Sequence, residues 1–302
     1  MSFDIIIKKL IKYSHVIYNS STITTRSIGA FNVSTKGLND ENNKQRESII
    51  GAIINNKIPN NYYNKHEWAV MKGAIQSYLA ELTGGRPYVT VECIHKGGRK
   101  HNHDFDFKFL YVGDSEPCTF KVELKFNALS ISHAPQYSSP MKPSQYMSDS
   151  YEEYYYTNYL NQLSAMAGLP MPTKEDYLKQ IHFNSPICMT KYKELYDTDQ
   201  TFHEFAKKLS HESIEQFIKN TELNIDLLSA YLFNTQKDKV YMLYSNNAFI
   251  LQHANMDDYI IEKIITRTHN RYECSTKSGK TMKILLRWKN GNGIAFPAFQ
   301  IS

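Results

Sequence analysis

The spacing of apolar residues changes sharply in the first half of the chain, and this change restricts the fold most. Residues 65–83 carry apolar side chains at helical spacing, and Gly84-Gly85 ends the pattern. From Tyr88 onward the spacing becomes two, over 88–94, 103–112 and 119–126, with short turns between these segments. A helix followed by three strands with short turns predicts an antiparallel meander packed against the helix.

The middle segment of this meander alternates between two kinds of side chain. Successive side chains of a strand point to opposite faces of the sheet. The sequence HDFDFKFLYV therefore predicts one face with three phenylalanines and one polar face. The two sets are Phe105, Phe107 and Phe109, and Asp104, Asp106 and Lys108.

The remaining chain divides into three regions by pattern. Residues 1–62 form an N-terminal helical region, with helices expected over 1–19 and 41–56. Residues 127–236 begin with prolines and continue with helical patterns, which indicates a mostly helical insertion. Strands are expected again over 239–244 and 248–253, then a short helix near 255–265 and a hairpin of 271–275 with 281–288. The expected core is 63–126 plus 237–302.

Composition excludes several classes of protein. The 302 residues are 41% hydrophobic and 22% charged, which is typical of a globular chain and not of a disordered one. No apolar run reaches the roughly 18–20 residues that span a bilayer. The four cysteines form no CxxC pair, so free thiols are expected. We therefore expect an intracellular protein, in a cytoplasm or a virion, that is not secreted and has no membrane partner.

Basic residues are concentrated at the end of the chain. The formal net charge is +5, but residues 263–302 hold eight basic residues and only Glu273 as an acid, a local net charge of +7. Such a concentration favours a polyanionic partner. A solvated charged surface is the alternative interpretation.

Acidic residues and a lysine are expected to meet on the polar face of the meander. Glu123 and Lys125 lie two apart, so both point to one face. If the 113–118 turn closes a hairpin, residues 106–108 face 123–125, and Asp106 joins Glu123 and Lys125 with Asp104 beside them. One residue of slippage exchanges the two aspartates, so either remains a candidate. Two carboxylates and a lysine predict a Mg²⁺ site, which Mn²⁺ could also occupy.

This pattern resembles the PD-(D/E)xK motif of restriction-endonuclease-like nucleases. Asp106 or Asp104, followed by Glu123-Leu124-Lys125, matches that motif, although no proline precedes the aspartate, and the resemblance covers residues 65–126. It implies an α/β fold with a restriction-endonuclease-like core (helix, antiparallel meander and mixed central sheet) and a helical insertion. It also implies a Mg²⁺-dependent endonuclease that cleaves double-stranded DNA, of the type II restriction kind and sequence-specific.

The resemblance also assigns roles to residues outside the motif. The preceding helix often carries a further acid in this family, for which Glu67 and Glu81 are both candidates. Gln136 matches a polar residue that follows the active strand. The C-terminal segment LLRWKNGNGIAFPAFQIS resembles the ends of some restriction enzymes, which implies backbone contacts from Arg287 and Lys289. Arg99 and Lys100 are further candidates for DNA binding. A homodimer is expected from the family alone.

Several other functions fit parts of the same sequence. A repair or recombination nuclease acting on junctions, ends or RNA is one. A non-catalytic nucleic-acid-binding protein on the same fold is another, and a structural protein with a solvated acidic hairpin is a third. His95, His101 and His103 are expected in a turn beside the acidic face. No phosphate-binding glycine motif and no G-x-S-x-G sequence occurs.

Overall fold

The computed structural model describes residues 15–33, 39–97, 101–133, 142–180, 191–289, 293–294 and 296–302. The chain forms two compact units, each built from two segments. Unit 1 comprises Met1–Ala134 and Gln236–Ala254, and unit 2 comprises Pro135–Thr235 and Asn255–Ser302. The division differs from the expected core of 63–126 plus 237–302. Residues 255–302 belong with the helical segment, and the described part of the N-terminal region belongs to unit 1.

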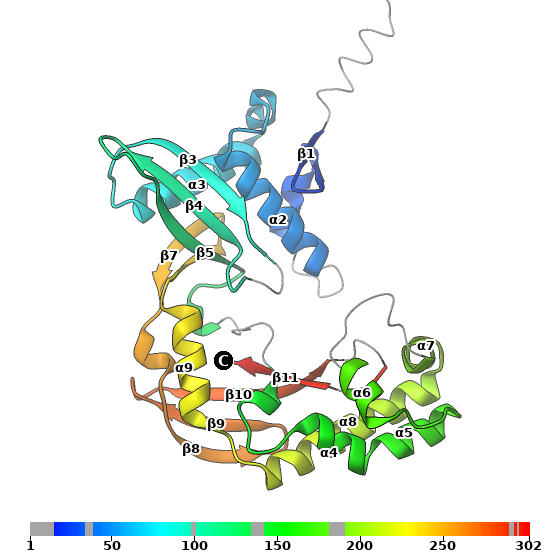
Figure 1. Cartoon of the computed structure of the whole chain (residues 1–302). Helices are drawn as coiled ribbons and strands as arrows, with labels where there is room; N and C mark the ends of the chain where they lie inside the picture. The colour runs from blue at the N-terminus through cyan, green and yellow to red at the C-terminus, as the bar shows by residue number, and fades with distance from the viewer. Residues whose placement is uncertain are drawn as a thin grey trace, which may run out of the picture. The chain divides into compact units, whose positions relative to one another are not determined.

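Unit 1 contains a mixed five-stranded sheet in the order β3-β4-β5-β6-β7 (Figure 1). The strands β3 (Tyr88–His95), β4 (Phe105–Tyr111) and β5 (Cys118–Phe126) form the predicted antiparallel meander. Strand β6 (Lys239–Ser245) pairs with β5 in parallel, and β7 (Ala248–His253) returns antiparallel to β6. The protein is therefore of the α/β class.

Two helices of unit 1 pack into one apolar core with this sheet. They are α2 (Asn39–Ile54) and α3 (His66–Leu82). Helix α3 buries Trp68, Met71, Ile75 and Tyr78, which follow its predicted apolar spacing. It ends where Gly84 and Gly85 adopt positive φ angles, and the Gly85 N–H bonds the Ala80 carbonyl at 2.8 Å.

Strand β4 confirms the predicted alternation. Phe105, Phe107 and Phe109 are fully buried in the core, while the residues between them are only partly buried. Short elements precede α2 and α3 in unit 1. They are β1 (Val16–Tyr18), β2 (Ser21–Ile23), η1 (Ser27–Asn32) and η3 (Asn60–Asn64), with η4 (Ile131–His133) after β5. The helix expected over 1–19 lies mostly outside the described residues, and residues 16–18 are a strand.

Unit 2 combines helices with an antiparallel four-stranded sheet in the order β11-β10-β9-β8 (Figure 1). The strands are β8 (Ile261–Thr268), β9 (Arg271–Thr276), β10 (Thr281–Lys289) and β11 (Phe296–Ile301). The helical elements are η5 (Pro143–Gln145), α4 (Tyr151–Asn158), α5 (Leu160–Ala167), α6 (Lys174–Gln180), α7 (Lys191–Thr198), α8 (Gln200–Asn220), α9 (Ile225–Gln236) and η7 (Met256–Tyr259).

The helix expected near 255–265 is wrong. Only Met256–Tyr259 is helical, as a short 3-10 turn, and Ile261 begins strand β8. The isoleucines at 260, 261, 264 and 265 imitate helical spacing. In the sheet, the pairing of β8 with β9 has two irregularities, and each inserts one extra residue into β8. After each extra residue the alternation of side chains between the two faces of the sheet is shifted by one, and this accounts for the spacing of the isoleucines.

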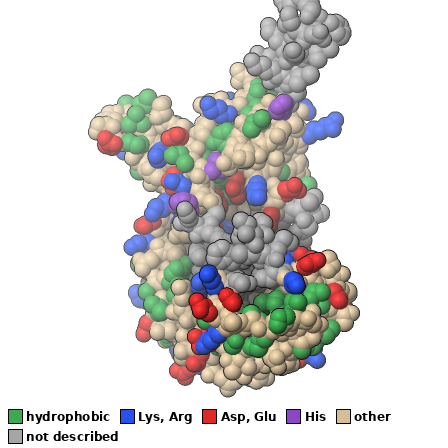
Figure 2. Space-filling view, turned by 45° about the vertical axis from the view of Figure 1, so that its right-hand side comes forward, with side chains coloured by type: hydrophobic (Ala, Val, Ile, Leu, Met, Phe, Trp, Pro, Cys, Tyr) green, Lys and Arg blue, Asp and Glu red, His purple; other side chains and the backbone are tan. Residues whose placement is uncertain are grey.

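The surface of the molecule carries both signs of charge. On the face shown in Figure 2, basic and acidic side chains are interspersed. Within the described residues, every helix is too short or too polar to cross a lipid bilayer. Cys93, Cys118 and Cys274 are free thiols, as expected.

Candidate functional site

The start of β4 brings Asp104 beside β5. Phe105 pairs with Val122, and the Asp104 backbone N–H donates to the Val122 carbonyl at 3.0 Å. The Asp104 Oδ2 atom accepts a hydrogen bond from the Leu124 N–H at 2.7 Å. The Asp104 carboxyl therefore accepts the kind of hydrogen bond that the backbone of a paired strand would accept from β5. The Leu124 N–H that donates this bond directly follows Glu123 in the chain.

Two lysines contact the carboxylate of Glu123. Lys125, two residues further along β5, donates from Nζ to Glu123 Oε1 at 2.7 Å. Lys239 opens the neighbouring strand β6, and its Nζ lies 3.5 Å from Glu123 Oε2 and donates to the Asn102 carbonyl at 2.7 Å. The side chain of Lys239 is only 3% exposed, so its charge depends on these partners.

The two carboxyls differ in their readiness to ionise. Burial, and then the charge of Glu123, raise the pKa of Asp104 to about 7, against the Leu124 N–H and the two lysines. Burial would also raise the pKa of Glu123, but Lys125 and Lys239 outweigh it and lower that pKa. Glu123 is therefore an anion at neutral pH, while Asp104 loses its proton near pH 7.

The charges of Asp104 and Glu123 also act on Glu47, an acid of helix α2 that was not among the predicted site residues. Burial first, then the charges of Asp104 and Glu123, raise the pKa of Glu47 to about 7. The charges of Asp104 and Glu123 therefore oppose the ionisation of Glu47. The sequence predicts the helix acid within 65–83, because this helix directly precedes the strands. The available signal was the polar triplet Arg46-Glu47-Ser48 directly before an isoleucine-rich apolar stretch.

The buried contacts of Arg46 fix the position of α2, the helix that carries Glu47. Its side chain is fully buried, with Nε donating to the Ala30 carbonyl at 2.8 Å and Nη2 to the Val33 carbonyl at 2.7 Å. The guanidinium also lies 3.4 Å from the ring centroid of Phe126, the last residue of β5. This contact joins the helix that carries Glu47 to the strand that carries Glu123 and Lys125.

Asp106 does not join the cluster, which corrects the expected pairing of 106–108 with 123–125. In the observed register Asp106 pairs with Lys121, because the hairpin at 112–117 sets the strands four residues away from the expected match. Its carboxylate contacts His103 Nε2 at 2.7 Å and Lys96 Nζ at 3.1 Å. Burial would raise the pKa of Asp106, but Lys96 and His103 outweigh it and lower that pKa.

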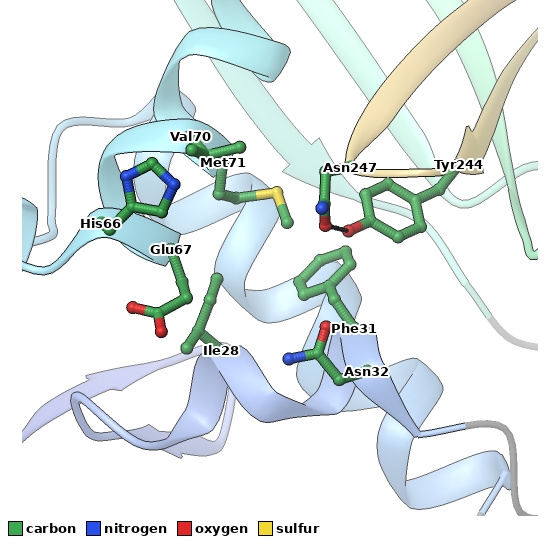
Figure 3. A pocket seen from close by; sticks show the side chains of 9 residues that line it. All are labelled: Ile28, Phe31, Asn32, His66, Glu67, Val70, Met71, Tyr244 and Asn247. Carbon is green, nitrogen blue, oxygen red and sulfur yellow. Dashed lines mark hydrogen bonds between the residues drawn. The ribbon is translucent and has the colours of Figure 1, made fainter.

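Glu67, like Asp106, does not lie beside Asp104 and Glu123. It is exposed at the start of α3 and lines a cavity of about 170 Å³. In Figure 3, Glu67 and His66 lie on one side of this cavity, and Tyr244 and Asn247 lie on the other. Glu81 is exposed near the end of α3. The helix acid predicted at Glu67 or Glu81 is therefore an exposed residue of α3 in either case.

The other predicted site residues are either outside the described residues or in unit 2. Arg99, Lys100 and Gln136 are outside them. Arg287 and Lys289 lie on β10, opposite Ala298 and Phe296 of β11.

The donor atoms of the cluster suit a hard divalent cation. Asp104, Glu123 and Glu47 offer carboxylate oxygens, which Mg²⁺ prefers, and their mutual repulsion is what such an ion would relieve. Within the described part of the chain, no three His, Cys, Asp or Glu side chains are grouped so that they hold an ion as they stand. Since Mg²⁺ usually keeps several waters, one or two carboxylates suffice for it.

Comparison with known proteins gives no further identification. The sequence matches no protein-family model and no curated protein.

Proposed function

We propose that the protein is a Mg²⁺-dependent nuclease that hydrolyses phosphodiester bonds of double-stranded DNA. The observation that carries the proposal is the cluster of Asp104, Glu123 and Lys125 at adjoining ends of β4 and β5. Their order along the chain resembles the PD-(D/E)xK pattern with Asp104 as its aspartate. The mixed sheet of unit 1 is compatible with a restriction-endonuclease-like core, and cleavage of the restriction type, at a specific sequence, is part of the proposal.

Each residue of the cluster has a role in this proposal. Asp104 and Glu123 would hold Mg²⁺ (or Mn²⁺), which supplies positive charge to a phosphate that becomes more negative during hydrolysis. Lys125 orients the attacking water as an ammonium held at 2.7 Å by Glu123. To remove the proton of that water, Lys125 must first lose its own proton and act as the neutral amine. Lys239 keeps Glu123 ionised from the other side. Glu47 supplies the acid expected from a preceding helix.

A non-catalytic nucleic-acid-binding protein is the second candidate. One observation favours it: the described residues contain no preformed group of three metal ligands. The two candidates share a nucleic-acid partner and differ in whether the partner is cut.

Cleavage of supercoiled plasmid and of long linear DNA separates the candidates. We expect Mg²⁺-dependent cleavage into discrete fragments, abolished by EDTA and by Lys125→Ala. Lys121→Ala is the matched control, because Lys121 lies on the same strand but is half exposed, and its described ion pair is with Asp238, at 3.6 Å. Salt-sensitive retention of DNA without cleavage by the wild type would overturn the nuclease proposal and support the second candidate.

A further inference from the structure

The four-stranded sheet of unit 2 has two unlike faces. Along β9 and β10, buried and exposed residues alternate, and Tyr272, Cys274, Ile284 and Leu286 are all buried on one side. This side is covered by other parts of the same unit. The hydroxyl of Tyr272 contacts the Thr221 carbonyl at the end of α8, and Phe299 of β11 lies against the ring of Tyr146. On the opposite side, Thr281, Lys283 and Arg287 of β10 are exposed.

Cations from three strands share this second side, which we call the open face. Strand register places them there, because residues directly opposite each other in an antiparallel pair point to the same side. Lys263 pairs with Ser275, Lys283 with Glu273, Arg271 with Leu285, and Arg287 with Ala298. The open face is defined by its basic residues Lys263, Arg271, Lys283 and Arg287.

The open face carries a clear excess of positive charge. Glu273 is the acid in register with these four cations, and Glu262, which is exposed beside Lys263, falls at an irregularity of the β8–β9 register. Basic residues therefore outnumber acids four to two on or beside this face. Lys263, Lys283 and Arg287 are exposed, and Arg271 is partly exposed. Among the residues that the structure describes, Lys263, Arg271 and Lys283 have no ion-pair partner within 4.0 Å. These three charges are therefore available to a partner.

Three other basic residues of the C-terminal segment have described partners. Arg267 pairs with Tyr272, so it points to the covered side, where its guanidinium lies 5.8 Å from the centroid of the Tyr272 ring. Lys277 contacts Asp257 at 3.1 Å, and Lys280 contacts Asp258 at 2.8 Å. Lys277 and Lys280 therefore form ion pairs within unit 2, whereas the described ion pairs do not include Lys263, Arg271 or Lys283.

The polar groups of the open face suit a phosphate backbone. Thr266 and Thr268 share the register of Glu273 and Arg271, and Gln300 pairs with Leu285, so hydroxyl and amide donors lie among the cations. Lysine, arginine, threonine and glutamine are residues that contact phosphate oxygens.

We propose that the open face of unit 2 binds the phosphate backbone of duplex DNA, separately from the acidic cluster of unit 1. The choice of DNA rests on the proposed function, but binding by this face needs neither metal nor cleavage. Neighbouring strands lie about 4.8 Å apart, so cations on three strands spread over a flat area wider than a single phosphate group. Unit 2 thus holds the substrate and unit 1 cuts it.

Anisotropy of a labelled duplex of random sequence, with the full chain in EDTA, measures this binding without cleavage. We expect Lys263→Ala with Lys283→Ala to weaken binding at least 10-fold, and to reduce the slope of log affinity against log salt by about 2. The matched control is Lys277→Ala with Lys280→Ala, which removes the same charge from paired lysines and should leave the slope nearly unchanged. Arg271→Gln should give a smaller loss than the open-face pair.

Two results would overturn the proposal. One is an equal loss in the open-face pair and in the control pair, which would indicate only net charge. The other is a loss of binding to vesicles of anionic phospholipid, but not to duplex, in the open-face pair. Cleavage by the same proteins in Mg²⁺ is read separately. If the wild type binds but never cuts, the open face stands and the nuclease proposal fails. If it cuts while the open-face pair binds normally, only the present proposal fails.

Discussion

The two sheets of this protein use charge in opposite ways. In unit 1, Asp104, Glu123 and Lys239 are largely buried, contact one another or backbone groups, and have shifted pKa values. In unit 2, Lys263 and Lys283 stand on an exposed face without a described ion pair. Buried charge is costly unless it is paired, whereas exposed charge is cheap and acts at longer range. The comparison shows that burial and pairing, more than residue type, decide the role of a charged side chain. The buried charges of unit 1 are suited to catalysis or ion binding, and the exposed charges of unit 2 are suited to attracting a charged partner.

The largest expected effect separates the two aspartates of the meander. Asp104→Asn should reduce Mg²⁺-dependent cleavage on the order of 10³-fold, because it removes a charged oxygen beside Glu123. Asp106→Asn should reduce it far less, since Asp106 contacts Lys96 and His103 instead. Initial rates of plasmid nicking measure both. Equal losses would mean that the two acids act together and that the distinction drawn from the register is wrong.

The next prediction tests whether the two units unfold independently of each other. Phe107→Ala in unit 1 should cost about 3–5 kcal/mol and Ile284→Ala in unit 2 about 2–5 kcal/mol, because both side chains are fully buried. The chain has two tryptophans, Trp68 in unit 1 and Trp288 in unit 2. Denaturant unfolding of single-tryptophan variants should show each substitution shifting the transition of its own unit. A common shift at both tryptophans would show that the units unfold together.

A smaller loss is expected from the helix acid. Glu47→Gln should lower cleavage about 10–100-fold, the range typical of residues that support a metal site. Glu41→Gln is the matched control, since Glu41 lies in the first turn of the same helix and is exposed. DNA binding in EDTA should be unchanged in both variants. A reduction in binding by Glu47→Gln would instead assign this acid to substrate attraction.

The smallest effect concerns pH. The pKa of Asp104 is about 7 in the folded chain and near 4 when unfolded, so the unfolded chain releases this proton first. Folding stability attributable to Asp104 is therefore lost as pH rises from 4 to 7. Asp104→Asn should raise the melting temperature by about 3 °C at pH 8, roughly the shift that 1 kcal/mol gives a unit of this size, and by less at pH 4. A gain that is constant over pH would contradict the assigned pKa.

Much of unit 1 was predictable because its signals are local. The alternation of Phe105, Phe107 and Phe109 with polar residues defines a half-buried strand, and Gly84-Gly85 terminates a helix wherever that helix packs. The site was less predictable, because strand register depends on the conformation of the 112–117 turn. That register decides that Asp104, and not Asp106, lies beside Glu123.

Long-range packing was not readable from sequence. Helix α2 was predicted, but its docking depends on buried contacts of Arg46 with the Ala30 carbonyl and with Phe126, residues far apart in sequence. The division into units was missed for a similar reason. Nothing in the composition marks Ala254–Asn255 as the point where the chain leaves one sheet and begins to build another. Sorting of the C-terminal cations likewise depends on the bulges of β8.

Calorimetric titration of Mg²⁺ into the DNA-free protein at pH 7 tests the central claim most directly. The claim is that Asp104 and Glu123, and not Asp106, form a cation site. We predict one binding event in the wild type and in Asp106→Asn, and its loss in Asp104→Asn and in Glu123→Gln. Undiminished binding in Asp104→Asn, or no binding by the wild type, would contradict the claim.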